Sequence, residues 1–318
     1  MNEIRVLAPA TVANVVCGFD CLGFALDGPF DEMTIRRVDD PGIRIIHHDG
    51  FGLPTEPERN VAGVAAGAIL NAAGLDFGIE IEITKHIKPG SGIGSSAASA
   101  CGAVVAIDRL LGQPFSYLEL VGFAMEGEAL ASGARHADNL APCIFGGFTL
   151  VRSTDPLEIV PLDFPPLWAT VIHPQIEMKT SEARAILPRE VPLKTAVRQW
   201  ANVGALVAGL AKGDHSLIAR SMEDPIVEPV RRSLIPRFDD VKKAALAAGA
   251  MGGGISGAGP SIFMLSRDKE TAATVEKAMS DAYEQTGIKF NTHVSGIARR
   301  GVRVLTGSEG ASLEIGQT

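Results

Sequence analysis

The chain has few aromatic residues and little basic charge. Its 318 residues include only two Trp and two Tyr, and 37 Asp and Glu outnumber 29 Lys and Arg, which gives a formal net charge of -8. Nonspecific binding to nucleic acid draws its affinity from clustered Lys and Arg. The sequence has no such cluster, so nucleic acid is not an expected partner. Hydrophobic residues still make up 46% of the chain, enough for a globular protein with a substantial core.

Cysteine pairs and apolar runs are also scarce. Among four cysteines, Cys17 and Cys21 form one loose pair, and no second pair completes a zinc site, so reduced and mostly buried thiols are expected. The uncharged stretch from Pro89 to Ile107 is rich in Gly and Ser, so it is not expected to cross a membrane. The first nine residues carry Glu3 and Arg5 and lack the apolar segment of a secretory signal, which predicts a cytoplasmic location.

Residue patterns in the first half of the chain predict a mixed sheet with helices. Alternation with period two predicts strands, and capping residues such as Asn60 and the pair Ser116 and Glu119 predict helix starts. Between the first two strands, Pro, Asn, Gly and Asp interrupt any period and predict a structured loop. The expected strands are Ile4–Leu7, Glu32–Arg37 and Ile79–Thr84, and the expected helices are 60–73, 96–111 and one from Ser116 to about Ala131.

The length predicts a division into two domains, because a single core usually stops growing below this size. The proline-rich stretch from Pro156 to Pro174 has few helical signals, so we place the division there, giving domains of residues 1–165 and 166–318. Beyond it, alternating patterns predict an α+β second domain. Its expected helices are Leu193–Ala211, Phe238–Ala248 and Lys269–Gln285, and its expected strands are Ser261–Leu265 and Ile288–Val294.

The strongest local signal is KPGSGIGSSAAS at residues 88 to 99, a glycine-rich turn that leads into a helix. Three glycines let the backbone approach a phosphate without Cβ clashes, and the unpaired N–H groups of a new helix attract an anion. A Walker A loop would need Lys after the last Gly, but Ser95 follows Gly94, and a dinucleotide fingerprint beginning at Gly90 would need Gly at position 95. Taken alone, the segment also fits a plain strand-to-helix turn.

Four motifs in order along the chain resemble those of the GHMP small-molecule kinases. They are PATVANVVCGFDCLG at 9 to 23, KPGSGIGSSAAS, HADNLAPCIFGG at 136 to 147 and GGISGAGPS at 253 to 261. The resemblance implies an α+β fold with two domains. The first is a mixed sheet with helices, ribosomal protein S5 domain 2-like, and the second is a ferredoxin-like α/β sandwich. Val16, Ile93 and the position of Pro89 depart from the family pattern.

The chain most closely resembles the branch of the family that phosphorylates L-homoserine. That resemblance implies ATP as co-substrate, Mg²⁺ as metal and L-homoserine as acceptor. It also implies that the second glycine cluster, GGISGAGPS, approaches the phosphates or the substrate from the C-terminal domain, with a plain strand-entry turn as the alternative. We expect no membrane partner and a homodimer.

Glu128 can be interpreted from helical spacing. It lies on the same predicted stripe as Leu118, Val121 and Met125, whereas Glu126 falls on the opposite, polar face. A carboxylate that points inward is costly unless a cation or a donor meets it. Glu128 is therefore a candidate magnesium ligand, and a buried salt bridge is the alternative.

The resemblance implies a second magnesium ligand, Ser96. An ordinary N-terminal helix serine is the plain alternative, and Ser95 is the neighbour that could take its role. The implied nucleotide-binding residues lie in or near the glycine-rich turn: Asn60, Lys88, Pro89, Gly90, Ser91, Gly92, Ile93, Gly94, Ser95, Ser96, Ala97 and Ala98.

The resemblance also implies an acceptor site that suits an amino acid. Asp20 can pair with an ammonium group, and the guanidinium groups of Arg184 and Arg231 can hold a carboxylate. Taken singly, these are ordinary turn and surface residues, and Arg232 is the neighbour that could replace Arg231. The implied acceptor residues are Asn14, Asp20, His136, Asn139, Arg184, Arg231 and Gly257, and the implied catalytic residues are Asn139, Ser96, Glu128 and Arg184.

An obvious general base is missing from these motifs. Mevalonate and galactose kinases of the family place an Asp near the acceptor hydroxyl, where Asn139 stands here, and Asp138 is not promoted on sequence position alone. Catalysis is therefore expected to rest on alignment and charge stabilisation. The alternatives are another kinase of this family, acting on mevalonate, an isoprenoid phosphate or shikimate, and a noncatalytic ATP-binding regulator.

Overall fold

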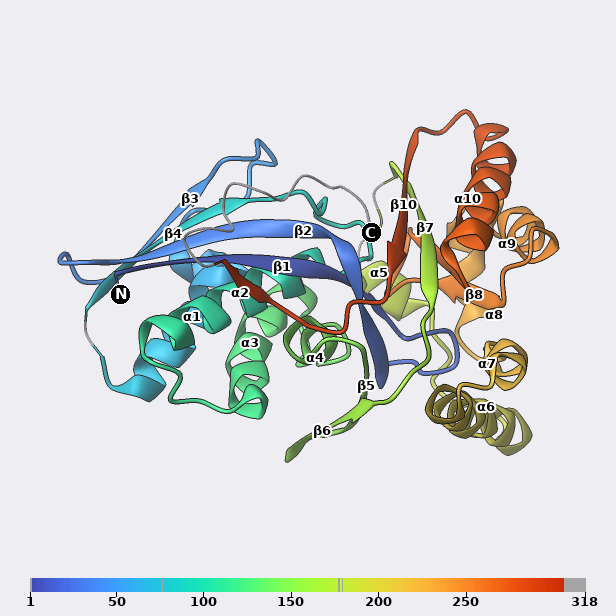
Figure 1. Cartoon of the computed structure of the whole chain (residues 1–318), viewed down its shortest axis with the longest axis horizontal. Helices are drawn as coiled ribbons and strands as arrows, with labels where there is room; N and C mark the ends of the chain where they lie inside the picture. Colours follow the sequence, from blue (N-terminus) through green and yellow to red (C-terminus); the bar gives the residue numbers. More distant parts are fainter. Residues whose placement is uncertain (1, 76, 177, 179, 306–318) are drawn as a thin grey trace.

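The computed structural model describes residues 2–75, 77–176, 178 and 180–305. Within these residues the strands form two sheets that lie one after the other along the long axis of the molecule, each with helices packed against it (Figure 1). None of the helices in this part of the chain is both long enough and apolar enough to cross a membrane.

The first sheet is mixed, as the sequence predicts. Its strands follow the order β11-β1-β2-β4-β3, with β5 pairing with β2 and β6, and β3 and β4 are parallel while the other neighbours are antiparallel. The strands are β1 Glu3–Ala13, β2 Leu22–Val38, β3 Ile43–His47, β4 Gly78–Thr84, β5 Phe148–Thr154, β6 Leu157–Leu162 and β11 Arg303–Leu305.

Helices cover one face of this sheet (Figure 1). Ile79, Ile81 and Ile83 point from β4 into that buried side, while Glu80 and Glu82 pair with Arg36 on the other face, which confirms the strand with one wet face. The helices are α1 Val61–Ala73, α2 Ser95–Leu110, α3 Tyr117–Ser132 and α4 Leu140–Phe145, with a 3₁₀ turn at Pro57–Arg59.

Predicted helix boundaries in this domain are confirmed. The side chain of Asn60 accepts a hydrogen bond from the backbone of Ala62, and Gly74 ends α1 in the left-handed conformation. Ser116 and Glu119 form the expected capping box at the start of α3.

The predicted loop at residues 9 to 23 is partly wrong, because β1 continues to Ala13. A register shift between Pro9 and Thr11 lets the strand keep its pairing with β2 beyond the proline. The loop itself begins at Asn14, and Asn14, Val15, Val16 and Asp20 all have positive φ.

The second sheet follows the order β10-β7-β9-β8, with antiparallel neighbours throughout. Along the chain its main elements run strand, helix, strand, strand, helix, strand, which is the ferredoxin-like arrangement expected from the resemblance. The strands are β7 Trp168–Pro174, β8 Gly252–Ile255, β9 Ile262–Ser266 and β10 Phe290–Gly296. The helices are α5 Thr180–Ala185, α6 Leu193–Lys212, α7 His215–Ser221, α8 Glu228–Arg231, α9 Phe238–Ala247 and α10 Lys269–Glu284, with a 3₁₀ turn at Arg232–Leu234.

A shared core joins the two sheets. Phe24 of β2 and Phe263 of β9 meet with ring centroids 5.6 Å apart, and Ile93 of the glycine-rich turn belongs to the same buried cluster. The division that we propose near residue 165 falls between β6 and β7, and the chain returns to the first sheet at β11. The turn is therefore anchored between the two sheets.

Candidate active site

The glycine-rich turn connects β4 to α2. Gly90, Gly92 and Gly94 have φ of 73°, 82° and 71°, values that glycine adopts without steric cost. Gly94 is the N-cap of α2, and no side chain in the described part of the protein caps this first turn. Its N–H groups and the positive end of the helix dipole are thus available to an anion.

A buried ion pair lies next to this turn and supports it. Lys85, directly after β4, donates to a carboxylate oxygen of Asp31 in β2 and to the backbone carbonyl of Ser95 at 3.0 Å. The other oxygen of Asp31 accepts the two backbone N–H groups of residues 86–87, at 2.8 and 2.9 Å. Both charges are fully buried and well hydrogen-bonded, so the pair fixes the path from β4 into α2. Sequence reasoning missed it, because its members lie 54 positions apart.

The two serines at the start of α2 point to different partners. The hydroxyl of Ser95 donates to the carbonyl of Ile87 at 2.8 Å, whereas the hydroxyl of Ser96 donates to Oε2 of Glu128 at 3.0 Å. Burial raises the pKa of Glu128, and its hydrogen bond from Ser96 opposes that rise. Ser96, rather than Ser95, therefore brings an oxygen beside the carboxylate.

These two oxygens suit a magnesium ion. Mg²⁺ prefers oxygen ligands and usually keeps one or two protein ligands beside phosphate and water. In the described residues no group of three or more His, Cys, Asp and Glu side chains could hold a metal, so an ion at Ser96 and Glu128 would need those outer ligands. The neighbouring Glu126 instead pairs with Arg135 at 2.8 Å on the exposed side, as its predicted position requires. Val121 and Met125 are buried, but Leu118 is exposed, contrary to the predicted stripe.

A hydrogen-bond network gathers the predicted acceptor residues. The guanidinium group of Arg184 in α5 donates hydrogen bonds to both carboxylate oxygens of Asp20, at 2.9 and 3.1 Å. Asn14 accepts from the backbone N–H of Asp20 at 2.9 Å and donates to the carbonyl of Gly257 at 2.8 Å. Arg231 donates to the same carbonyl at 3.2 Å. Residues from four distant segments thus meet at one place.

Arg231 and Arg232 point in different directions. Arg231 is 3% exposed, donates through Nε to the carbonyl of Ala183 at 3.0 Å, and has a pKa lowered mainly by burial. Arg232 points to solvent and pairs with Asp239 at 3.1 Å. The inward arginine is the one that the motif identified.

His136 joins the same cluster, with Nδ1 3.8 Å from Oδ1 of Asp20. Burial lowers its pKa, and its Nε2 is buried without a hydrogen-bond partner among the described residues. A buried polar atom without a partner is costly. This nitrogen is therefore a place where a bound molecule could supply the missing hydrogen bond.

Asn139, which the resemblance also assigned to the acceptor site, lies beside the glycine-rich turn. Its Oδ1 accepts from the hydroxyl of Thr11 at 2.7 Å, and a Cβ added at Gly94 would lie 2.0 Å from that hydroxyl oxygen. Only a glycine fits at position 94. The adjacent Asp138 is buried, and its pKa rises to about 7 because of burial first and then the charges of Asp20 and Glu128.

The second glycine cluster packs directly on the turn. Ser256 donates to the carbonyl of Gly92 at 2.7 Å, and Ser261 donates to that of Ser91 at 2.6 Å. A Cβ at Gly92 would lie 2.6 Å from the carbonyl oxygen of Gly259. The C-terminal domain therefore holds the turn through two serine hydroxyls, and its backbone approaches so closely that position 92 has no room for a side chain.

Other predicted nucleotide residues lie farther from these contacts. Asn60 is buried, and its amide group donates to the carbonyl of Pro54 at 2.6 Å besides capping α1. Lys88 is exposed and donates to Gln175 at 2.7 Å, while Ala97 and Ala98 are buried in α2. Their part in binding a nucleotide stays a prediction.

Two residues of the acceptor cluster escaped the sequence reasoning. The ring of Phe19 lies 5.4 and 5.1 Å from the guanidinium carbons of Arg184 and Arg231, so it supports both cations. Asp224 lines the small cavity at Asn14 and Arg231, and its carboxylate caps the start of α8. Phe19 stands beside Asp20 in the first motif, which was the available signal.

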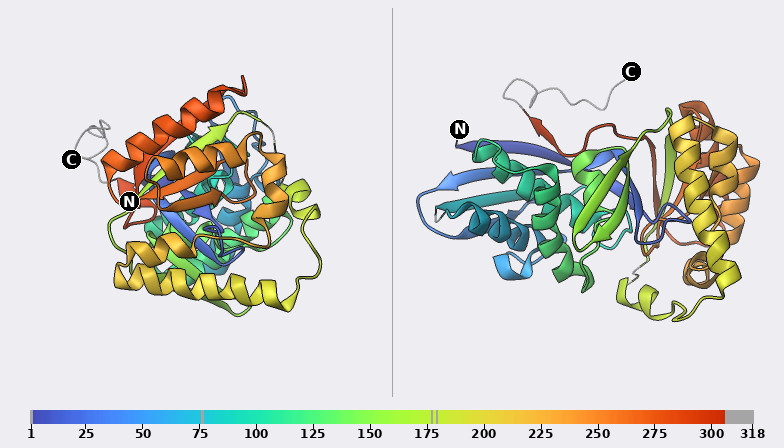
Figure 2. Two further views of the ribbon diagram at one scale, coloured as in Figure 1. Left: turned by 90° about the vertical axis from the view of Figure 1, so that its right-hand side faces the viewer. Right: turned by 90° about the horizontal axis from the view of Figure 1, so that it is seen from below.

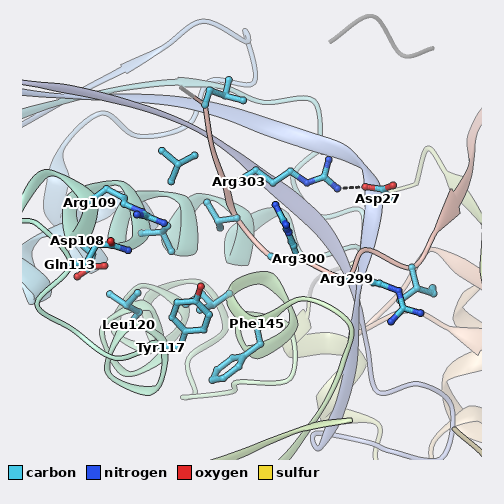
Figure 3. Close-up of a pocket in the computed structure, with 17 residues that line it drawn as sticks. Asp27, Asp108, Arg109, Gln113, Tyr117, Leu120, Phe145, Arg299, Arg300 and Arg303 are labelled. Carbon is cyan, nitrogen blue, oxygen red and sulfur yellow. Dashed lines mark hydrogen bonds and ion pairs between the residues drawn. The ribbon is translucent and has the colours of Figure 1, made fainter. Parts of the chain in front are cut away.

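A cavity larger than the one at Asn14 and Arg231 lies elsewhere, beside β11 (Figure 3). It measures about 1000 Å³, and Arg109, Tyr117, Phe145 and Arg300 are among the residues around it. None of the predicted site residues lines it. Size alone therefore does not identify the active site in this protein.

Comparisons with known proteins identify the family. The family model described as GHMP kinases N terminal domain matches residues 60–147, and the model described as GHMP kinases C terminal matches residues 206–285. The homoserine kinase of Chloroherpeton thalassium is 47% identical, over 96% of this chain and 100% of that protein.

Solved structures with a similar fold include kinases of the same family. The crystal structure of homoserine kinase from Cytophaga hutchinsonii matches with a TM-score of 0.92 and 52% identity, over 96% of this chain and 98% of that one. The L. major mevalonate kinase in complex with R-mevalonate matches with a TM-score of 0.69 and 17% identity, over 91% and 95%. The latter likeness concerns the fold alone.

Proposed function

The chain belongs to the GHMP kinase family, and from that premise we propose that it transfers the γ-phosphate of ATP to the hydroxyl of L-homoserine. The product is O-phospho-L-homoserine, an intermediate of threonine biosynthesis. The observation that carries the choice of acceptor is the network of Asn14, Asp20, Arg184, Arg231 and Gly257.

This network suits a zwitterion. Asp20 offers a carboxylate to an ammonium group, and Arg184 and Arg231 offer two guanidinium groups to a carboxylate. In the structure Asp20 and Arg184 satisfy each other. A substrate that carries both charges can replace both halves of that pair, whereas mevalonate or shikimate, which lack an ammonium group, would leave Asp20 without a cation. The acceptor site therefore favours an amino acid.

ATP and Mg²⁺ fit the residues at the start of α2. The open first turn of the helix and the positive φ of Gly90, Gly92 and Gly94 suit the phosphates, and Ser96 and Glu128 would hold the metal. When bound, Mg²⁺ supplies a counter-charge to the phosphates. The protein's own part is to keep these groups aligned. The buried pair of Lys85 and Asp31 contributes by fixing the path from β4 into α2.

Alignment rather than a general base accounts for the proposed catalysis. Asn139 is held by Thr11 next to Gly94, so its amide can position an acceptor hydroxyl near the phosphate turn. An amide cannot take up a proton at neutral pH. Proton loss from the hydroxyl would therefore accompany or follow phosphoryl transfer.

A screen of acceptors tests this proposal. ATP consumption is measured with homoserine, mevalonate, shikimate, galactose and no acceptor, while mass spectrometry identifies the product. We expect turnover and a phosphorylated product with homoserine. Turnover with mevalonate or shikimate instead would indicate another kinase of the family, and ATP binding without turnover on any acceptor would indicate a regulator.

Two further expectations belong to this proposal. We propose a cytoplasmic location, in keeping with small biosynthetic substrates, and association of two copies of the chain. Exposed apolar residues on one helix of the C-terminal domain support the second expectation.

A further inference from the structure

Three largely buried side chains join the end of β3 to the start of α1. His47 is the last residue of β3, Asp49 follows in the next loop, and Asn60 is the N-cap of α1. Nδ1 of His47 lies 3.1 Å from Oδ2 of Asp49, and Nδ2 of Asn60 lies 3.1 Å from Nε2 of His47. This helix belongs to the first domain, in the half of the molecule away from α6 and α10 (Figure 2, right).

The orientation of the Asn60 amide follows from its backbone partners. Its nitrogen donates to the carbonyl oxygen of Pro54 at 2.6 Å, and its oxygen accepts the N–H of Ala62 at 2.9 Å. The second N–H of the amide therefore meets Nε2 of His47, which must be the acceptor. A neutral imidazole that accepts at Nε2 carries its proton on Nδ1, and that N–H faces Asp49.

Asp49 has the charge that this arrangement needs. The backbone N–H of Phe51 donates to it at 3.0 Å, and the backbone N–H of Lys85 donates to it as well. Burial alone would raise the pKa of Asp49, but these hydrogen bonds and the one from His47 lower it, so the side chain is an ionised acceptor. Because Lys85 also donates to the carbonyl of Ser95, the network is tied to the connection from β4 to α2.

The start of α1 lies close to the proposed metal site. A Cβ added at Gly127 would lie 2.4 Å from the carbonyl oxygen of Val61, and Gly127 directly precedes Glu128 in α3. Asn60, directly before Val61, is therefore near the groups proposed to hold the triphosphate. Both N–H groups of its amide are taken. Among the described residues only Ala62 donates to Oδ1, so one lone pair of that oxygen is left for a bound molecule.

We propose that His47 is a positioning residue for the nucleotide, because it holds the amide of Asn60 so that only the amide oxygen is offered to the base. This inference rests on the proposed ATP-dependent function. An amide oxygen can accept a hydrogen bond from the exocyclic amino group of adenine, whereas it repels the carbonyl oxygen that hypoxanthine carries at the same position. The network therefore favours ATP over inosine triphosphate.

Calorimetry of nucleotide binding with Mg²⁺ and without an acceptor tests this preference. The original chain should bind ATP about tenfold more tightly than inosine triphosphate, which is the change expected for one hydrogen bond. Asn60→Ser keeps a side chain that can cap α1 but removes the amide, so it should abolish the preference. The measurement needs no acceptor, so it can fail while phosphorylation of homoserine stands.

Two substitutions of His47 separate positioning from packing. His47→Asn keeps a donor toward Asp49 but is too short to reach Asn60, whereas His47→Gln can place its oxygen where Nε2 lay. The preference for ATP should fall several-fold in His47→Asn and recover in His47→Gln. In His47→Asn the KM for ATP should rise while kcat and the KM for homoserine change little. His48→Asn, at the neighbouring side chain that is 50% exposed, is the matched control and should behave like the original chain.

Each contrary result overturns the inference. Equal affinities of the original chain for the two nucleotides exclude the preference, and a chain that binds neither nucleotide contradicts the proposed function as well. A preference that survives in Asn60→Ser excludes contact between the amide and the base. A preference that His47→Asn leaves intact, or that both His47 variants lose equally, assigns His47 a structural role alone. Thermal unfolding of every variant separates loss of nucleotide affinity from loss of the fold.

Discussion

The glycine-rich turn and the acceptor cluster lie side by side but are built in different ways. The turn is one continuous segment proposed to bind phosphate through its backbone, with positive φ at Gly90, Gly92 and Gly94. The acceptor cluster takes side chains from widely separated segments, among them Asn14, Asp20, Arg184 and Arg231. A backbone site depends on the absence of side chains, whereas a side-chain site depends on their charge.

This difference fits the division of labour in a kinase family. Every member must bind the same triphosphate, and a backbone cradle with a helix terminus can do so without a particular set of charged groups. Acceptors differ, and charged side chains can be exchanged without rebuilding the turn. Substitutions should therefore separate into those that impair phosphate and metal handling and those that impair acceptor binding.

The largest effect is expected from Glu128→Gln. Loss of the carboxylate beside Ser96 removes the charged oxygen ligand proposed for Mg²⁺, so kcat should fall by about 10² or more. Magnesium titrations of turnover measure this change. Glu126→Gln, two positions away and on the exposed side, is the matched control and should behave like the original enzyme. Unchanged kinetics across the titration would remove Glu128 from the metal site.

Arg184→Ala should give the next largest effect and should act on the acceptor alone. Loss of its guanidinium should raise the KM for homoserine about 10²-fold, because a two-point charged contact disappears, while the KM for ATP changes little. Arg232→Ala, which removes an exposed arginine paired with Asp239, is the control. Equal increases in both KM values would contradict a separate acceptor site.

Two glycine substitutions distinguish backbone conformation from close packing in the turn. Gly90→Ala and Gly92→Ala place a side chain at similar positive φ, but a Cβ meets nothing within 4 Å at Gly90 and lies 2.6 Å from the carbonyl oxygen of Gly259 at Gly92. Gly92→Ala should therefore raise the KM for ATP about tenfold more than Gly90→Ala. Equal effects would mean that the C-terminal domain does not hold the turn.

Features decided by neighbouring residues could be predicted from the sequence, whereas features decided by contacts between distant residues could not. The caps of α1 and α3 were predicted because Asn60, Ser116 and Glu119 act within three residues of their own position. Strand β7 was missed in the proline-rich stretch, because its pairing with β9 and β10 decides its structure. The ferredoxin-like order came from the resemblance and not from these residue patterns.

The candidate site shows the same limit. The motifs indicated Arg184 and Arg231, but the bond from Arg184 to Asp20 spans 164 positions and cannot be derived from spacing. Likewise, Lys85 and Asp31 appear in the sequence as two ordinary charges of separate segments. The direction in which Asp138 faces was also undecided. The structure places it in the interior, near enough to Asp20 and Glu128 for their charges to raise its pKa.

The buried position of Asp138 predicts a smaller effect on acceptor binding, one that depends on pH. Burial and the nearby carboxylates raise the pKa of Asp138 from 3.8 to about 7. As pH rises from 6 to 8, Asp138 should therefore lose its proton and add a negative charge near the proposed ammonium site. Homoserine should bind the nucleotide-free enzyme several-fold more tightly at the higher pH, as measured by calorimetry.

Asp138→Asn separates this effect from the titration of other groups. The variant should bind homoserine with little pH dependence over the same range, whereas a persistent dependence would assign the effect to another group. Stability gives a second measurement with a defined sign. Because the folded protein holds the proton of Asp138 up to about pH 7 and the unfolded chain releases it near 3.8, folding takes up a proton between these values. The original protein should therefore lose stability relative to Asp138→Asn as pH rises through that window, which thermal unfolding can follow.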